Sequence, residues 1–374
     1  MYIILLMISV KHKLYPTAKQ ENYLSGCLWS AIGIENWALG QIRNTVSDQV
    51  EAFPLACMKP QQLRSVLSRR IKGHSAKCGL PSRLINDCIG AVITTVKKIG
   101  ISKARCKSAR KKNSFYFLGD IKIGRDGRLK LPGIKTTFRM SEQDKFQGRL
   151  KKVTLIKKWN GWYAVCVYDE ERKPIKCSDS KKAGIDPGLK TAIVLSDGTE
   201  HAFPRWYQDR QELLGKLQRK SKHSKRVKAL FAKIANKRLD HHHKLSTGLA
   251  GEYQKIYWSD DNFKGLIRIK NLGKSYANLG LGAFRDMLQA KLASRADGQG
   301  ELIKVNSRYS TQTCNACGAR TGPKGRSGLG VREWVCRDCG ISHDRDRNAA
   351  INTLLSGRGA SADLRNCISL EQTA

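Results

Sequence analysis

The sequence predicts an α+β protein of more than one domain. Two changes of hydrophobic period support this prediction. Apolar residues recur at three- and four-residue steps from Thr17 to about Ser108, and then alternate in short runs up to about residue 176. After that, strand patterns and helix patterns alternate. With 374 residues, of which 40% are hydrophobic, the chain has enough apolar material for two or three cores.

The first half of the chain reads as a strand, a helical region and a β-rich region. Residues 2–15 alternate well enough for a strand. Thr17 and Gln20 have the spacing of a capping box at the start of the helical region. In the β-rich region, Gly, Asp and Asn separate short runs of strand-forming residues, and WNGW indicates a hairpin. We expect these strands and the first strand to form a single barrel into which the helices are inserted.

The second half begins with strands and continues with helices. GIDPGLKTAIVLSDGTE, residues 184–200, predicts two strands joined by a tight glycine turn. Residues 205–250 predict a basic helical hairpin, and KIYWSDD at 255–261 predicts a further strand. Residues 273–296 have the pattern of one helix, and residues 301–310 have that of a last strand.

The charge of the chain predicts a polyanionic partner. Lys and Arg total 69 against 31 Asp and Glu, which gives a formal net charge of +38. Such an excess repels itself unless an anion neutralises it, and the phosphates of nucleic acid suit it best. A membrane surface is the alternative, but we find no separate basic amphipathic anchor, and MYIILLMISV is too short to span a bilayer. We therefore expect nucleic acid, and no membrane, as the partner.

Four of the twelve cysteines have the pattern of a metal site. Cys314 and Cys317 form one C-x2-C pair, and Cys336 and Cys339 form a second pair after eighteen intervening residues. This arrangement is typical of a zinc ribbon, in which four thiolates complete a tetrahedral shell. A closed shell leaves no open position, so the expected Zn²⁺ is structural and not hydrolytic. The other eight cysteines are scattered singly, which favours the reducing cytoplasm.

Two aspartates lie on elements that could bring them together. Asp186 lies in GIDPG on a predicted strand, and Asp346 lies in HDRDRNAAIN at the start of a predicted helix. Ala349 and Ala350 share a helix face with Asp346, and such small side chains allow close packing on a sheet. Asp346 alone would usually be a helix cap. Strand-borne and helix-borne carboxylates across a mixed sheet can, however, hold two Mg²⁺ ions about 4 Å apart for phosphodiester cleavage.

The order of these motifs resembles that of the TnpB family of RNA-guided nucleases, the insertion-sequence relatives and ancestors of type V CRISPR effectors. The motifs that carry the resemblance extend over nearly the whole chain: KHKLYPTAKQ, WNGWYAVCVY, GIDPGLKTAIVLSDG, STQTCNACG, REWVCRDCG and HDRDRNAAIN. The resemblance implies a RuvC-like site, a guide RNA, and a target double-stranded DNA with a short flanking motif. Base pairing would read the sequence while the basic protein holds the backbone.

The resemblance also implies a fold. It is a wedge-type β-barrel with an inserted helical recognition lobe, followed by a RuvC-like RNase H fold, a mixed sheet with helices, that carries an inserted zinc ribbon. The expected segments are a first wedge strand at 1–16, the helical lobe at 17–108, the wedge barrel at 109–176, the first part of the RuvC-like domain at 181–307 including the basic hairpin at 205–250, the zinc ribbon at 308–342, the final RuvC-like helix at 343–356, and a C-terminal tail at 357–374.

The middle acid of the family's site is not found at its usual position. Matched to the family, Asp186 is the first catalytic aspartate and Asp346 the last, and both would bind Mg²⁺. The family's glutamate corresponds to Ser259, and an alternative position before the ribbon holds Ser307. Serine is neutral and cannot replace a carboxylate that bridges two divalent cations.

Three other acids could take over the role of the missing glutamate. Asp260 adjoins Ser259 but points to the opposite face of a strand unless a bulge turns it inward. Glu301 and Glu333 are more distant and are ordinarily surface residues. We expect cleavage to be weakened or lost, which would leave an RNA-guided DNA-binding repressor. A fully active endonuclease that uses Asp260 or another acid is the alternative.

A second class of function is a non-guided zinc-ribbon DNA-binding protein that assists transposition. It would explain the charge and the cysteines but not the two aspartates. A tightly bound RNA of defined sequence would distinguish the two classes. In either class we expect the protein in the cytoplasm, associated with the nucleoid.

Overall fold

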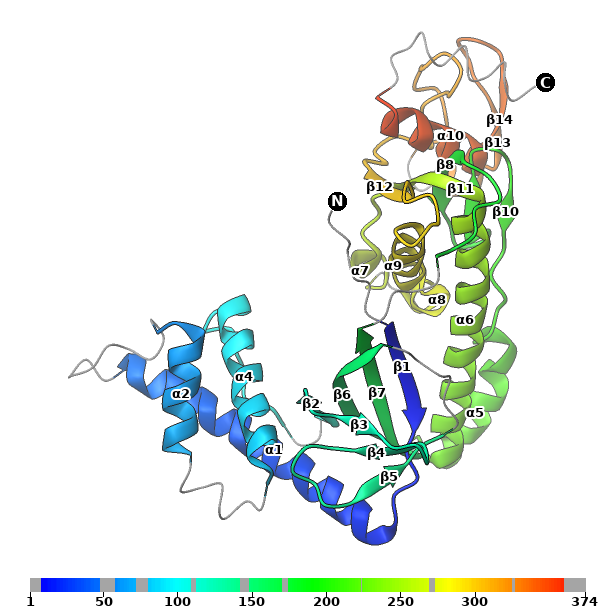
Figure 1. The fold of residues 1–374 in the computed structure, drawn as a ribbon. Helices are drawn as coiled ribbons and strands as arrows, with labels where there is room; N and C mark the ends of the chain where they lie inside the picture. Colours follow the sequence, from blue (N-terminus) through cyan, green and yellow to red (C-terminus); the bar gives the residue numbers. More distant parts are fainter. Residues whose placement is uncertain are drawn as a thin grey trace. The chain divides into compact units, whose positions relative to one another are not determined.

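A computed structural model describes most of the chain, and its residues fall into two units (Figure 1). The units comprise residues 1–172 and 173–374. The start of the predicted first strand and most of the predicted tail lie outside the described residues. The described ranges are 8–47, 58–71, 80–108, 112–141, 148–169, 174–222, 224–268, 273–324 and 327–359.

The first unit contains two antiparallel sheets. One has the strand order β1-β7-β6-β2 and the other the order β3-β4-β5. The backbones of Leu14 and Met140 pair between the two sheets. The described strands thus form two linked sheets, and the single closed barrel stays a prediction. The strands are β1 (Ile8–Lys13), β2 (Ser114–Leu118), β3 (Lys122–Ile123), β4 (Arg128–Lys130), β5 (Thr137–Arg139), β6 (Arg149–Lys158) and β7 (Gly161–Asp169).

The hairpin and the capping box of the first unit form as the sequence predicts. β6 and β7 pair antiparallel, with Lys158 opposite Gly161, so that Trp159 and Asn160 make the turn. At the start of α1, the backbone N–H of Thr17 donates to Gln20 Oε1 at 3.0 Å, and that of Gln20 donates to Thr17 Oγ1 at 3.3 Å. The helices are α1 (Ala18–Ser47), α2 (Pro60–Arg70) and α4 (Ser82–Ile99), and their buried faces share one core with the strands.

The second unit is built on a five-stranded mixed sheet. Its strand order is β10-β9-β8-β11-β12, in which β8, β11 and β12 run parallel while β9 and β10 are antiparallel to their neighbours. Two short strands, β13 and β14, form a separate antiparallel pair near the cysteines, so the strand ending at 305 is not the last one. The strands are β8 (Lys181–Pro187), β9 (Ile193–Leu195), β10 (Glu200–His201), β11 (Tyr253–Ser259), β12 (Glu301–Val305), β13 (Glu333–Val335) and β14 (Ser342–Asp344).

Helices lie beside this sheet (Figure 1). The predicted basic hairpin is formed by α5 and α6, and α6 packs against α9. The helix predicted at 273–296 is instead two helices, because Gly280 adopts a left-handed conformation with φ of 67° between them. The helices are α5 (Gln211–Lys220), α6 (Lys225–Glu252), α7 (Phe263–Leu266), α8 (Gly273–Leu279), α9 (Leu281–Leu292), α10 (Arg345–Gly357) and the short 3-10 turns η2 (Gln208–Arg210) and η3 (Ser327–Gly330).

Close approach of α10 to the sheet depends on a glycine in β8. A Cβ atom at Gly184 would lie only 2.1 Å from the carbonyl oxygen of Ala350 and 2.5 Å from the backbone nitrogen of Leu354. Tyr257 and Leu354 belong to the small apolar cluster under the helix. Because residue 184 is glycine, α10 can pack close to the strands, and this also brings the acidic residue at the start of α10 near them. Among the helices that the structure describes, none is both long enough and apolar enough to cross a membrane.

Candidate metal centres

The four predicted cysteines come together as one cluster. Their sulfur atoms all lie within 4.8 Å of one another. The Sγ atoms of Cys314 and Cys339 are 3.7 Å apart, and those of Cys317 and Cys336 are 3.6 Å apart. Four thiolates at about 2.3 Å from a tetrahedral Zn²⁺ would have sulfur atoms about 3.8 Å apart. The cluster therefore has the dimensions of a structural zinc site.

Both cysteine pairs sit on the same kind of turn. The backbone N–H of Gly318 donates to the carbonyl of Cys314, and the N–H of Gly340 donates to that of Cys336, each at 2.9 Å. Both glycines have a left-handed conformation, with φ of 83° and 73°. His343 Nε2 lies 3.0 Å from Cys314 Sγ. Such contacts to a ligand atom orient it and are typical of metal sites.

The second candidate site lies at the carboxyl ends of the three parallel strands. Trp258 of β11 pairs with Ile185 of β8, so one step further along both strands Ser259 stands beside Asp186. Ser259 in turn pairs with Val305, the last residue of β12. The carboxyl ends of parallel strands are the usual place for ligands in α/β sheets. Asp186 and the two serines of interest, at 259 and 307, are thus gathered at one edge.

Asp346 reaches the same edge from α10. Asp186 lies two residues after Gly184 and therefore points to the face of the sheet that α10 covers. Asp346 lies one helical turn before Ala350, which contacts Gly184. The cap of α10 is Asp344, whose carboxylate accepts from the N–H of Arg347 at 2.7 Å. Asp346 is therefore not the cap, and its Oδ2 instead pairs with Arg332 at 2.5 Å.

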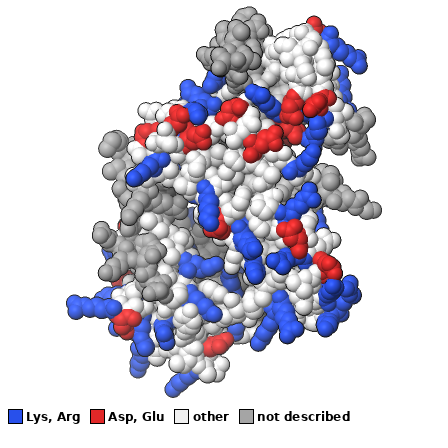
Figure 2. All heavy atoms as spheres, turned by 90° about the vertical axis from the view of Figure 1, so that its right-hand side faces the viewer, with Lys and Arg blue, Asp and Glu red and all other residues white. Residues whose placement is uncertain are grey.

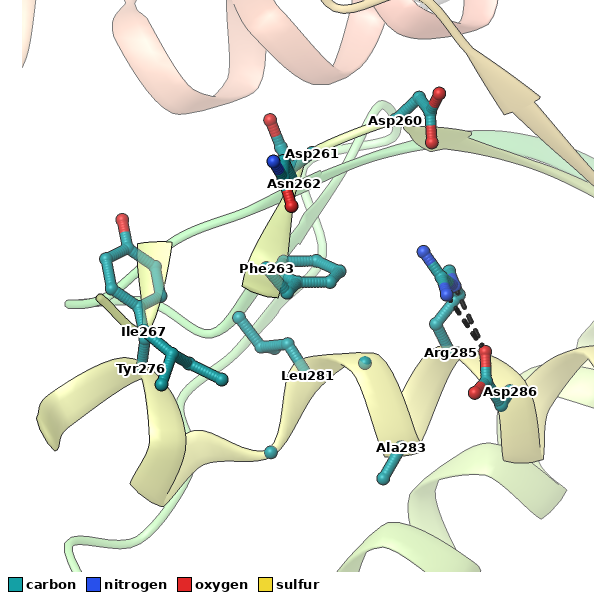
Figure 3. Close-up of a pocket in the computed structure, with 12 residues that line it drawn as sticks. Asp260, Asp261, Asn262, Phe263, Ile267, Tyr276, Leu281, Ala283, Arg285 and Asp286 are labelled. Atoms are coloured by element: carbon teal, nitrogen blue, oxygen red, sulfur yellow. Dashed lines mark hydrogen bonds and ion pairs between the residues drawn. The ribbon is translucent and has the colours of Figure 1, made fainter. Parts of the chain in front are cut away.

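A third carboxylate, from Asp261, joins this edge, and the sequence analysis did not single it out. Strand β11 ends at Ser259 and not at residue 261. Ser259 Oγ donates to Asp261 Oδ2 at 2.8 Å, and Ser307 Oγ approaches Asp261 Oδ1 at 3.4 Å. Asp261 also lines a cavity of about 540 Å³, shown in Figure 3, where the side chains of Asp260 and Asp261 extend in different directions. A usable signal existed, because residues two apart on a strand share a face.

The charges of Asp261 and Asp346 act on Asp186. The pKa of Asp186 is raised well above its ordinary value, first by burial and then by the charges of Asp261 and Asp346, while Arg345 and Arg332 oppose the rise. Burial, and to a smaller extent the charge of Asp260, raises the pKa of Asp261, and the hydrogen bonds from the two serines counter part of that rise. Carboxylates that repel one another in this way are a suitable setting for a divalent cation.

The other predicted acids are exposed and make different contacts, although Asp260 lines the same cavity as Asp261. Asp260 is exposed, and its backbone N–H donates to the carbonyl of Val305 at 2.7 Å. Glu301, at the opposite end of β12, pairs with Lys255 at 3.3 Å. Glu333 lies in β13 and is exposed. Within the described ranges, only the four cysteines bring three or more candidate ligand atoms close enough for a single ion.

The fold resembles that of a solved protein. The chain is similar to the protein in "Cryo-EM structure of the Cas12f1-sgRNA-target DNA complex", with a TM-score of 0.55 and 13% sequence identity over 90% of this chain and 83% of that chain. At this identity the likeness shows the fold alone: a mixed α+β architecture with a mixed sheet.

Sequence comparisons confirm the resemblance to the TnpB family. The family described as "Probable transposase" matches residues 165–270, and the family described as "Cas12f1-like, TNB domain" matches residues 282–353. The chain is 30% identical to the "Putative RNA-guided DNA endonuclease" of Streptomyces pristinaespiralis over 213 residues, 54% of this chain and 51% of that protein. It is 26% identical to the "Putative RNA-guided DNA endonuclease InsQ" of Escherichia coli (strain K12), over 69% of each chain. The chain thus spans about half the length of the first relative.

Proposed function

We propose that this chain is an RNA-guided DNA-targeting protein of the TnpB type, with a RuvC-like, Mg²⁺-dependent endonuclease site. The observation that carries the proposal is the convergence of Asp186 and Asp346, which are 160 positions apart in the sequence, at one sheet edge next to the four-cysteine cluster. A non-guided zinc-ribbon protein that assists transposition has no need of two carboxylates gathered in this way.

The two units have the roles that the family resemblance assigns. We assign the two sheets of the first unit to the wedge barrel and α1, α2 and α4 to the inserted recognition lobe. The mixed sheet with α10 is then the RuvC-like RNase H fold, and the four-cysteine segment is its zinc ribbon. Guide RNA and a target duplex with a short flanking motif are the partners, and the cytoplasm, beside nucleoid DNA, is the compartment.

The charge of the surface suits these partners. Figure 2 shows one face of the molecule, on which Lys and Arg side chains are widely spread, while Asp and Glu side chains gather mainly in its upper part. Spread charge of this kind favours many phosphate contacts along a backbone over recognition of a single anionic ligand. Sequence would then be read by base pairing, as in other guided effectors.

The chemistry of the acid site follows from the positions of its side chains. Bound divalent cations stabilise the phosphate and the attacking and leaving oxygens. Asp186, near the end of β8 and affected by the charges of both other acids, would supply one carboxylate to such cations. Asp346 would supply a ligand from α10, and it must exchange the contact with Arg332 for a cation to do so.

A guided repressor is the second candidate, and one observation favours it. Ser259 and Ser307 leave both family positions of the middle acid without a carboxylate. Ser259 is fully buried, so water cannot easily take the place of the missing group. Asp261 at the same edge supports the nuclease over the repressor.

The test is to purify the protein with its bound RNA, sequence that RNA, and measure retention and Mg²⁺-dependent cutting of a matched duplex. A scrambled duplex of equal length is the control. We expect one defined RNA and retention of the matched duplex alone. Equal retention of both duplexes, or no defined RNA, would contradict guided targeting and favour the non-guided DNA-binding protein.

A further inference from the structure

We propose that Asp261 is the third metal-binding carboxylate of the acid site, and that Ser259 and Ser307 hold it in position. This inference rests on the proposed metal-dependent site and names the residue that completes it. The chemical class of the ligand is a hard divalent cation, Mg²⁺ or Mn²⁺, which prefers carboxylate oxygen.

A tight turn brings Asp261 back to the strand that precedes it. The backbone N–H of Asp261 donates to the carbonyl of Ser259 at 2.9 Å, which closes a three-residue turn directly after β11. The side chain therefore returns to the position of Ser259 instead of continuing along the strand. An aspartate two residues further on can in this way occupy the space that a longer glutamate side chain would reach from position 259.

The two serines occupy both family positions of the middle acid, and both face the same carboxylate. Ser259 approaches one oxygen of Asp261 at 2.8 Å and Ser307 approaches the other at 3.4 Å. A carboxylate has about four lone-pair positions, so two hydroxyl donors leave one free position on each oxygen. Carboxylates that bind metals are commonly oriented by such hydrogen bonds. The serines thus suit a positioning role.

The helix cap and the backbone contact to β12 are both provided by the neighbours of Asp261. The N-cap of α7 is Asn262, whose Oδ1 accepts from the N–H of Gly265 at 3.0 Å. The contact across to β12 is made by the backbone N–H of Asp260, which bonds to Val305. The helix cap and the backbone contact to β12 therefore do not require the Asp261 carboxylate, whose partners are the hydroxyls of Ser259 and Ser307.

The neighbouring Asp186 lacks a balancing group. No described residue donates a hydrogen bond to its carboxylate or forms an ion pair with it, although this side chain is half-buried and stands beside Ser259, the partner of Asp261. Enclosed charges are ordinarily paired or bound to metals. A cation shared between Asp186 and Asp261 would balance both, while the cavity beside Asp261 leaves the site open to a substrate.

The experiment compares Asp261→Asn with Asp260→Asn in the full chain with its bound RNA. Both variants replace an aspartate by asparagine at adjacent positions, and only Asp261→Asn changes the proposed ligand. Binding of Mn²⁺ is measured by calorimetry on zinc-loaded protein, and thermal unfolding with and without Mn²⁺ checks that each variant is folded. We expect Asp261→Asn to weaken Mn²⁺ binding by about tenfold or more and Asp260→Asn to bind as the wild type does.

Two further variants examine the positioning role of the serines. Ser307→Ala removes one hydrogen bond to Asp261 and should weaken Mn²⁺ binding by a smaller factor than Asp261→Asn does. Ser259→Glu adds an acid at the family position. Because it places a second charge beside Asp261, we expect no gain in cutting. A clear gain would mean that the middle acid is missing and would overturn the assignment of Asp261.

The outcomes separate this inference from the proposed function. Equal Mn²⁺ affinity of the wild type and Asp261→Asn overturns the inference. Failure of the wild type to retain a guide-matched duplex overturns the proposed function, and it does so whatever the Mn²⁺ results are. Asp261→Asn should retain both RNA and matched duplex, since the substitution removes only a cation ligand.

Discussion

The cysteine cluster and the carboxylate cluster of the second unit are built in opposite ways. The four sulfur atoms come from two short, similar turns and already lie within 4.8 Å of one another. The three carboxylates come from β8, the turn after β11 and the start of α10, and the charges of Asp261 and Asp346 raise the pKa of Asp186. The first arrangement suits one ion held permanently. The second suits ions that bind together with a charged substrate.

The two sites therefore depend on different parts of the fold. The cysteine turns are local and depend on two left-handed glycines. The carboxylates depend on strand register and on the depth at which α10 packs, which Gly184 permits. Damage to a single ligand should therefore abolish the first site, whereas the second should respond to changes in packing and charge.

The largest expected effect is the loss of the cysteine site. Cys336→Ser removes one of four ligands, and structural zinc sites contribute about 10 kcal/mol or more to folding in small peptides. We expect bound zinc, measured by elemental analysis, to fall from one per chain to none. Cys106→Ser, which changes an exposed cysteine outside the cluster, is the control and should leave zinc unchanged. Retained zinc in Cys336→Ser would contradict the assignment.

The next effect concerns packing under the carboxylates. Gly184→Ala forces a methyl group against the backbone of α10, and overpacking of this kind costs about 1–3 kcal/mol. We expect a lower Tm of the second unit and weaker Mn²⁺ binding, because Asp346 moves away with the helix. Gly248→Ala in α6, where nothing lies within 4 Å of the added Cβ, should instead stabilise the protein by up to about 1 kcal/mol. Equal effects of the two substitutions would show that α10 does not pack as described.

A smaller effect should come from the repulsion among the carboxylates. The pKa of Asp186 is raised in the folded protein above its ordinary 3.8, so the folded state binds more protons than the unfolded state in the pH range above 3.8. Stability of the metal-free protein should therefore fall as the pH rises through that range. Asp186→Asn removes this loss and should raise Tm at pH 7 by a few degrees. Unchanged Tm, with Asp260→Asn as the reference, would argue against the clustering of charge.

The smallest effect is expected at Arg332. Its ion pair with Asp346 is partly exposed to solvent, and such pairs contribute about 1 kcal/mol or less. Arg332→Gln should lower Tm of the metal-free protein slightly, and saturating Mn²⁺ should remove the difference, because the cation then takes over the role of the guanidinium. A difference that persists in Mn²⁺ would place the function of Arg332 outside the acid site.

Local patterns in the sequence predicted local structure well. The capping box at Thr17, the hairpin at Trp159 and the two cysteine pairs each depend on residues a few positions apart, and all three are confirmed. The pairing of Asp186 with Asp346 could be proposed because the motif order resembles a known family. Gly280 shows the limit of periodicity, because apolar spacing continues through a point at which the backbone breaks the helix.

For Asp261, a strand pattern indicates the face shared with Ser259, but its return to Ser259 depends on where the strand ends. The apolar run predicted a strand through residue 261, whereas β11 ends at Ser259 and a tight turn follows. Asp260 adjoins Ser259 in the sequence, but the carboxylate that bonds to the Ser259 hydroxyl is that of Asp261. The hydrogen bond from Ser307 joins segments 46 positions apart, and no local pattern reports it.

The most direct test is Mg²⁺-dependent cutting of a guide-matched duplex by the protein–RNA complex, with wild type, Asp260→Asn and Asp261→Asn compared side by side. We predict that the wild type and Asp260→Asn cut the duplex, and that Asp261→Asn holds it uncut. A wild-type complex that retains the duplex without cutting it, in Mg²⁺ or Mn²⁺, would contradict the nuclease and identify an RNA-guided repressor.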